Sequence, residues 1–363
     1  MGVKLKEILV QKKVNFSDIN GKVVAVDAPN LIMSLFCFAY KGQRYSMTRF
    51  MTDRTGRAIS HLYGLLFRVI FYYSKSILPI FCFDGRVHEL KRAITKDQLN
   101  DYLTTKKWYR NALERNDYAT ARRIASSREF TWPHAIEESK KLLSMMGVPY
   151  ILAPASAESQ CAHMVKQEIA DYAISQDFDT MVFGCPRTLQ NLNKSQKRKV
   201  RGKWIYKKVV PRVLDLQYNL DNLDIDIFHL VEIAILIGTD YFDGIEGIGP
   251  KTALSLVRTY GQMEHIMKAE SDKHDFSELT TDLLKKIRKI FLFPEVLEIL
   301  PDMRWDRPNK EAILELACSD HHLNQERVEN NVNKLISSYE MCRKTFSSCH
   351  PKSLKNMNLD SFL

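Results

Sequence analysis

The chain has 363 residues, 45% of them hydrophobic, with a formal net charge of +10 and a pI of about 9.1. This length allows one large domain or two ordinary ones with a real hydrophobic core. No uncharged apolar stretch reaches about 18 residues, so a membrane span is excluded, and the N-terminus lacks the apolar segment of a secretory signal. The seven scattered cysteines contain no Cys-x-x-Cys pair, which predicts free thiols in a reducing compartment rather than a zinc site.

Five short apolar runs, rich in β-branched or aromatic residues, predict buried strands. They cover residues 23–28, 78–83, 149–152, 172–175 and 181–183. Helical patterns over 58–75, 134–146 and 157–168 lie between them. The alternation predicts an α/β fold with a largely parallel central sheet.

Residues 86–132 interrupt this alternation with a polar, tyrosine-dotted stretch that holds eleven Lys or Arg and six Asp or Glu. So long an insertion between two strands that each end in a carboxylate favours a basic gate over a functional site. An exposed helical hairpin with a solvated face is the simpler alternative. A second basic run, Lys194 to Lys208, predicts a loop or hairpin that either contacts phosphates or is merely solvated.

From about residue 222 to 338 the pattern is helical, with a glycine-rich turn at 244–251 between two apolar helical patterns. Glycines there let backbone N–H groups approach a phosphate closely, and the N-terminus of the next helix favours negative charge. Such a helix-hairpin-helix grips a duplex backbone without reading its sequence.

Six acidic residues follow short apolar runs: Asp27, Asp84, Glu158, Asp177, Asp179 and Asp240. In an open α/β sheet the carboxyl ends of the strands line the crevice where ligands bind. Carboxylates gathered there repel each other, and hard divalent cations such as Mg²⁺ can hold them together. Two such ions about 4 Å apart can cleave a phosphodiester. With a basic surface to attract a polyanion, the pattern predicts a metal-dependent nuclease.

The chain resembles the flap endonuclease family of structure-specific 5′ nucleases, of the archaeal and eukaryotic replication type, over nearly its whole length. The most specific motifs are Val26-Asp27-Ala28, Phe83-Asp84-Gly85, Ser175-Gln-Asp-Phe-Asp179, and Ile237-Gly-Thr-Asp240-Tyr followed by Gly247-Ile-Gly249-Pro-Lys251. The resemblance implies a PIN-like nuclease core with helices on both faces of the sheet, a helical gate insertion and a C-terminal helical region.

The resemblance also implies roles for individual residues. Asp84, Glu158, Asp177 and Asp179 would lie nearest two Mg²⁺ ions, for which Mn²⁺ substitutes, while Asp27 and Asp240 would help through water or as further ligands. Lys91 would contact the scissile phosphate, Arg68 would contact another phosphate, and Gly2 would lie near the cleft. The hairpin, through Gly247, Gly249 and Lys251, would hold duplex DNA with a bound K⁺.

The implied partners are branched DNA with a 5′ flap and a PCNA-like sliding clamp. The clamp would bind a degenerate box at 356–363, formed by Asn356, Leu359, Phe362 and Leu363, although a frayed terminus with chance spacing is the alternative. The expected organisation is a nuclease core over 1–221 with its gate at 86–132, a helical DNA-binding region over 222–338 and a tail over 339–363. The location would be nuclear in a eukaryote and cytoplasmic in an archaeon.

Three positions depart from the family pattern. Ser156 stands where the family has a second glutamate, Met33 where it commonly has a base-stacking tyrosine, and Gln98 where the gate commonly has an arginine. Ser is a favourable helix cap but carries no charge for a hydrated metal. We therefore expect a flap endonuclease with reduced activity. The alternatives are a flap or junction DNA-binding protein that cuts poorly, and a sibling 5′ exonuclease.

Overall fold

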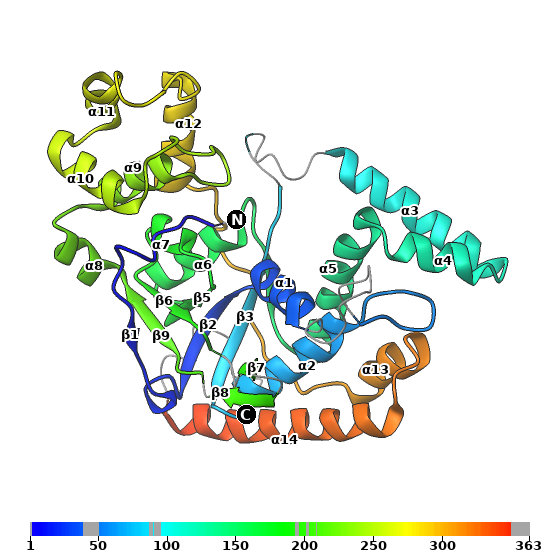
Figure 1. The fold of residues 1–363 in the computed structure, drawn as a ribbon. Coiled ribbons are helices and arrows are strands. Elements are labelled where there is room, and N and C mark those ends of the chain that lie inside the picture. Colours follow the sequence, from blue (N-terminus) through cyan, green and yellow to red (C-terminus); the bar gives the residue numbers. More distant parts are fainter. Residues whose placement is uncertain are drawn as a thin grey trace.

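The computed structural model describes residues 2–38, 51–86, 90, 96–192, 196–200, 203–207 and 209–349. Seven strands form one sheet in the order β1-β9-β6-β5-β2-β3-β4 (Figure 1). Their bounds are β1 Lys12–Lys13, β2 Lys22–Asp27, β3 Ile77–Phe83, β4 Tyr150–Leu152, β5 Tyr172–Ile174, β6 Arg187–Gln190 and β9 Arg212–Asp215. The strands from β6 to β4 run parallel, and only β9 and β1 are antiparallel to their neighbours. The predicted mostly parallel sheet is confirmed.

Fourteen α-helices are described. They are α1 Ala28–Phe38, α2 Ser60–Tyr73, α3 Lys96–Glu114, α4 Tyr118–Ala125, α5 Arg128–Met145, α6 Ala157–Lys166, α7 Asp179–Val182, α8 Leu216–Leu223, α9 Ile227–Ile237, α10 Pro250–Tyr260, α11 Met263–Glu270, α12 Thr281–Leu292, α13 Lys310–Leu314 and α14 Gln325–Cys349.

The order of the strands determines which face each helix covers. The chain moves from β2 to β3 and β4 in one direction, then returns to β5 and β6 on the other side of β2. Because crossovers between parallel strands are right-handed, the two directions place their helices on opposite faces. Accordingly, α2 packs against α1 and α5, whereas α6 packs against α7. The order reverses between β2 and β5, and such a switch point is where α/β sheets bind ligands.

Burial on both faces explains why the central strands are almost wholly apolar. All seven residues of β3 are buried, as are the last four of β2. These strands coincide with the predicted runs 78–83 and 23–28 to within one residue at each end. Burial of this apolar surface stabilises the sheet by about 25 cal/mol per Å².

The insertion between β3 and β4 is helical, as predicted, and α3 and α4 project away from the sheet (Figure 1). It has a small core of its own, separate from the main one, made of Tyr102, Tyr109, Ala112, Ala121, Ala125 and Phe130. The Phe130 ring lies 4.9 Å from that of Tyr109. We call α3, α4 and the start of α5 the gate hairpin.

Two expectations need correction. The run 181–183 is not a strand: Met181 and Val182 belong to the short helix α7, and the next strand is β6. Periodicity cannot separate a three-residue strand from a buried helical turn. In addition, α14 continues to Cys349, past the expected end of the helical region at 338. By contrast, the second basic run does contain a hairpin, β7 Gln196–Val200 paired with β8 Lys203–Lys207.

No helix in the described part of the chain is long and apolar enough to cross a membrane. Five of the cysteines lie within the described side chains, and all five are free thiols, four of them buried. The prediction of free rather than disulfide-bridged cysteines is therefore confirmed for these five.

A buried ionic network connects the base of the gate hairpin to the C-terminal region. The carboxylate of Glu138 on α5 accepts hydrogen bonds from Nε2 of His61 at 3.0 Å and Nε2 of His321 at 2.6 Å. The other ring nitrogen of His321 lies 2.9 Å from Oδ2 of Asp53, which also pairs with Arg57 at 2.8 Å. Burial alone would lower the pKa of His321, but its bonds to Asp53 and Glu138 outweigh this effect and raise the pKa to about 9.

We expect this network to make stability fall in alkaline solution. The folded pKa of His321 is raised above the ordinary value of 6.5, so its stabilisation is complete below about pH 6.5 and is lost as pH rises through about 9. His321→Gln should lower the free energy of unfolding at pH 7 by about 3 kcal/mol, because it removes the protonated imidazole that two buried carboxylates share, while Asp53 keeps its pairing with Arg57.

Urea unfolding at pH 6.5 and pH 9.5 measures both effects. The wild type should lose stability between the two pH values, and His321→Gln should lose much less. His322→Gln, at the exposed neighbouring position, is the control and should behave like the wild type. If the stability of all three proteins depended equally on pH, His321 would not be the group responsible for the loss in alkaline solution.

Candidate active site

Four neighbouring parallel strands deliver acids to one edge of the sheet. In the sheet order β5-β2-β3-β4, Asp27 is the last residue of β2 and Asp84 directly follows β3. Asp177 and Asp179 come after β5, and Glu158 lies in the first turn of α6, the helix after β4. The expected meeting of these acids follows from parallel pairing, because the carboxyl ends of all four strands point the same way.

The charges of these groups act on one another. Asp27 is only 3% exposed. The pKa of Asp27 is raised to about 7, first by burial, then by the nearby carboxylate of Asp84 and more weakly by that of Asp177. Hydrogen bonds from Asn30 and Ser175 lower the pKa but do not cancel this rise. A buried carboxylate that is repelled by its neighbours fits a position beside a cation.

Neutral donors orient three of the carboxylates. The backbone N–H of Ala157, at the N-terminus of α6, donates to Oδ1 of Asp84 at 2.8 Å. The backbone N–H of Val3 donates to Oδ1 of Asp179 at 2.6 Å. Nδ2 of Asn30 donates to Oδ2 of Asp177 at 2.8 Å.

Asn30 and Ser175 were not predicted from the sequence. The backbone N–H of Asn30 donates to Oδ1 of Asp27 at 3.2 Å, and the hydroxyl of Ser175 donates to Oδ2 at 3.0 Å. Asn30 thus joins Asp27 to Asp177 across the switch point between β2 and β5. One feature of the sequence could have identified Asn30: its amide side chain stands three residues after Asp27, at the start of a helix.

The N-terminal segment packs directly on the acids. A Cβ at Gly2 would lie 2.7 Å from Cβ of Asp177 and 3.1 Å from Oδ1 of Asp179. Only a residue without a side chain fits at this distance. The structure therefore brings Gly2 to the acidic edge, where the resemblance expected it.

Asp240 comes from a different part of the fold. It lies in the turn after α9, which is closed by a 2.7 Å bond from the backbone N–H of Thr239 to the carbonyl of Phe242. Helix α9 packs against α7, whose first residue is Asp179. Asp240 therefore belongs to the helical region rather than to the end of a strand in the sheet.

The donor set fits hard divalent cations, which take oxygen ligands. A separate group in the described part of the chain, Glu138, Asp320 and His321, offers ligand atoms that all lie within 4.8 Å of one another, and it includes none of the six acids. Two metal ions about 4 Å apart require donors spread around two centres. Asp84 and Asp177 both act on the charge of Asp27, and Asp177 and Asp179 both lie beside Gly2, so several oxygen donors meet at this edge.

The other predicted residues belong to α2, to the turn before α10 and to parts of the chain outside the described residues. Nη1 of Arg68 on α2 donates to the carbonyl of Leu192 at 2.7 Å. Gly247 has a φ of +83°, and a Cβ at Gly249 would meet no atom within 4 Å, so the turn before α10 presents open backbone. Lys251 is exposed in the first turn of α10. Lys91 and the tail residues Asn356, Leu359, Phe362 and Leu363 lie outside the described residues.

The three departures from the family pattern are only partly visible. The hydroxyl of Ser156 accepts from the backbone N–H of Ser159 at 3.0 Å, which confirms that Ser156 caps α6. Met33 is 49% exposed on α1. The side chain of Gln98 lies outside the described residues.

Comparison with known proteins supports one family. The XPG I-region family model matches residues 147–240, the segment that holds Glu158, Asp177, Asp179 and Asp240. Flap endonuclease 1 of Nanoarchaeum equitans is 36% identical over 338 residues, covering 92% of this chain and 95% of that protein. Flap endonuclease 1 of Methanosarcina acetivorans is 33% identical over 345 residues, covering 95% and 98%.

Solved structures agree on the fold. Flap endonuclease-1 from Methanococcus jannaschii superposes with a TM-score of 0.69 at 26% identity, covering 93% of this chain and 99% of that one. The catalytic core of Rad2 in complex with a DNA substrate gives a TM-score of 0.62 at 23% identity, covering 90% and 96%. The chain therefore belongs to the flap endonuclease family, and it is a metal-dependent, structure-specific nuclease.

Proposed function

We propose that the acids at the sheet edge hold two Mg²⁺ ions, with Mn²⁺ as a substitute, and that this centre cleaves at the base of 5′ flaps in branched DNA. One observation carries the proposal: neighbouring parallel strands deliver Asp177, Asp27 and Asp84 to a single switch point. Asp84, Glu158, Asp177 and Asp179 would hold the ions, with Asp27 and Asp240 as further ligands or water partners.

The chain itself supplies position and charge. Bound ions would activate a water molecule and stabilise the leaving 3′ oxygen. Asn30, Ala157 and Val3 fix the directions of the carboxylates, so little reorganisation is needed when a substrate arrives. We assign Lys91 the role of offsetting the negative charge that develops on the scissile phosphate. We assign Arg68 the role of contacting a second phosphate.

Three regions of the chain would have separate roles in DNA processing. The core over 1–221 would cut, the gate at 86–132 would cover the site, and the helical region over 222–338 would bind the duplex. Open backbone at Gly247 and Gly249, with exposed Lys251, supports phosphate binding at the hairpin. The backbone of this turn would hold a K⁺ ion, which would supply positive charge for the phosphates of the duplex.

The tail over 339–363 would recruit a PCNA-like sliding clamp through Asn356, Leu359, Phe362 and Leu363. Its spaced hydrophobes could fill a pocket as a short helical turn forms on binding. This role rests on sequence alone, because the box lies outside the described residues.

Cleavage of a 5′-labelled double-flap DNA tests the main proposal. With Mg²⁺, the wild type should cut at the base of the flap, and Asp179→Ala should lose at least about 10²-fold in rate. Asp171→Ala is the matched control, since Asp171 lies at the amino end of β5 and pairs with Lys22 there. DNA binding without cleavage in either Mg²⁺ or Mn²⁺ would favour the binding-protein alternative. Removal of single nucleotides would favour the exonuclease.

Ser156→Glu should raise the rate of cleavage, roughly 10- to 10³-fold, by restoring an electrostatic contributor. Its cost is a weaker cap on α6, about 1 kcal/mol of stability. Ser156→Ala removes the same cap without adding a carboxylate, so it separates the two effects. An unchanged or lower rate in a folded Ser156→Glu protein would refute this account of the position.

Asn30→Ala should raise the Mg²⁺ concentration needed for half-maximal rate by roughly 10- to 100-fold, because it removes a group that orients metal ligands. Calorimetric titration with Mn²⁺ should show the same weakening without DNA. Ser34→Ala, one turn further along α1, is the control, because its hydroxyl donates to the Leu31 carbonyl of the same helix at 2.6 Å. Unaltered metal binding in Asn30→Ala would rule out an orienting role.

A further inference from the structure

Helix α5 brings a lysine to the acidic edge of the sheet. Lys140 lies on α5, and its Nζ lies 5.0 Å from the centre of the Phe83 ring. Phe83 is the last residue of β3, and Asp84 follows it directly. The side chain of Lys140 therefore reaches the end of the strand that delivers a proposed metal ligand.

Two helices approach this strand end from opposite faces of the sheet. From α6, the backbone N–H of Ala157 donates to Oδ1 of Asp84 at 2.8 Å. From α5, on the face that α2 covers, the ammonium of Lys140 comes within electrostatic range of the same carboxylate. Burial lowers the pKa of Lys140, and the negative charge of Asp84 opposes this effect. A neutral donor thus orients Asp84, while the ammonium lies near it without forming a salt bridge to it.

The ammonium of Lys140 is half-buried and has no anionic partner in the described part of the chain. Glu137, one turn earlier on α5, already pairs with Lys106 at 2.5 Å and with Lys141 at 3.2 Å. Removing an ammonium from water is unfavourable unless an anion or a hydrogen-bond acceptor replaces the water. The ring of Phe83 compensates part of this cost. An anion beside Asp84 would complete the environment of Lys140.

The position of Lys140 indicates which anion this is. Asp84 is exposed at the edge of the sheet, where a metal ion held by it would bind a phosphate oxygen of the DNA. Lysine is a compact point charge on a flexible stem and a common phosphate ligand. We propose that Lys140 donates to a non-bridging oxygen of the phosphate at the cleavage point and offsets the charge that develops there. The inference rests on the proposed flap cleavage and adds a catalytic residue from outside the predicted gate at 86–132.

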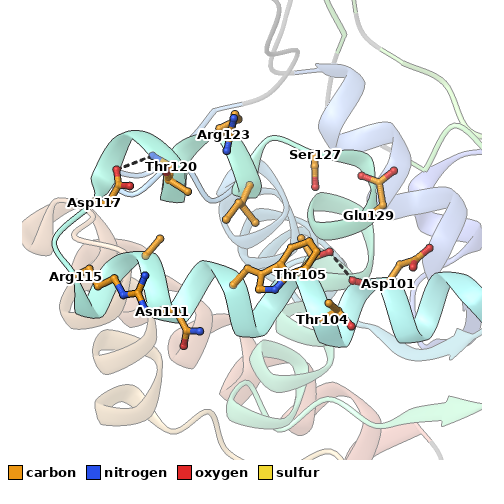
Figure 2. Close-up of a pocket in the computed structure, with 13 residues that line it drawn as sticks. Asp101, Thr104, Thr105, Asn111, Arg115, Asp117, Thr120, Arg123, Ser127 and Glu129 are labelled. Carbon is orange, nitrogen blue, oxygen red and sulfur yellow. Dashed lines mark hydrogen bonds between the residues drawn. The ribbon is translucent and has the colours of Figure 1, made fainter.

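The charges of the gate hairpin itself do not offer this group. Its groove, of about 800 Å³, is lined by two guanidinium groups and three carboxylates (Figure 2). These are Arg115 and Arg123, with Asp101, Asp117 and Glu129. The acids outnumber the bases there, so the groove does not favour a phosphate. The unpaired ammonium lies instead on the second half of α5, next to the acids of the sheet.

Single-turnover cleavage of the double-flap DNA at saturating Mg²⁺ tests the assignment. Lys140→Met keeps the length of the side chain and removes its charge, so the rate should fall roughly 10- to 10³-fold. Lys140→Gln, a second neutral variant, should show the same loss, and Lys140→Arg should recover most of the rate because it keeps a cation. Lys141→Met is the matched control, since Lys141 is 54% exposed and pairs with Glu137. It should cut like the wild type.

The dependence on Mg²⁺ separates a contact with DNA from a role in positioning Asp84. Lys140→Met should leave the Mg²⁺ concentration for half-maximal rate unchanged or lower it, because a positive charge no longer opposes the cations. A higher Mg²⁺ requirement with a wild-type rate at saturation would mean that Lys140 only positions Asp84, and it would overturn the proposed contact.

The salt dependence of DNA binding, measured by fluorescence anisotropy in Ca²⁺, reports the phosphate contact directly. Lys140→Met should reduce the slope of log affinity against log salt concentration by about one, whereas Lys141→Met should not. An unchanged rate in Lys140→Met, beside a wild type that cuts, would refute this inference and leave flap cleavage intact. A wild type that failed to cut would refute the proposed function itself.

Discussion

Mutual repulsion among carboxylates at one sheet edge is the constraint on which the rest of this structure depends. Two like charges 4 Å apart cost about 4 kcal/mol at an effective dielectric constant of 20. Burial first, and then repulsion from Asp84 and Asp177, raise the pKa of Asp27 to about 7. The wholly buried strand β3, paired along the full length of β2, holds the acids in place because its own apolar burial is large.

The groups that orient the acids are neutral, and this has a chemical consequence. Ala157 and Val3 donate through backbone N–H groups, and Asn30 donates through an amide. A Lys or Arg in these places would neutralise the carboxylates and compete with a cation. Neutral dipoles fix direction and leave the negative charge for the metal, as ligand-supporting groups do.

The sequence was sufficient to predict features that depend on residues close together along the chain. The positions of Asp27 and Asp84 follow from the ends of apolar runs, and the cap at Ser156 follows from residue type. Features that depend on distant partners could not be obtained: Asn30 meets Asp177 across 147 positions, and Glu138 meets His321 across 183. The prediction of a strand at 181–183 was wrong for a different reason. Three buried residues are too few to show whether the hydrophobic period is that of a strand or of a helix.

Ser156 illustrates how stability and charge compete at one position. Its hydroxyl satisfies the N–H of Ser159, and the N–H of Ala157 in the same helical turn holds Asp84. A firm cap on α6 therefore also steadies a proposed metal ligand. A glutamate there would add charge to acids that already repel one another, and it would cap the helix less well. If the acids hold metal ions as proposed, the serine gives up negative charge beside them and gains a better-ordered helix terminus.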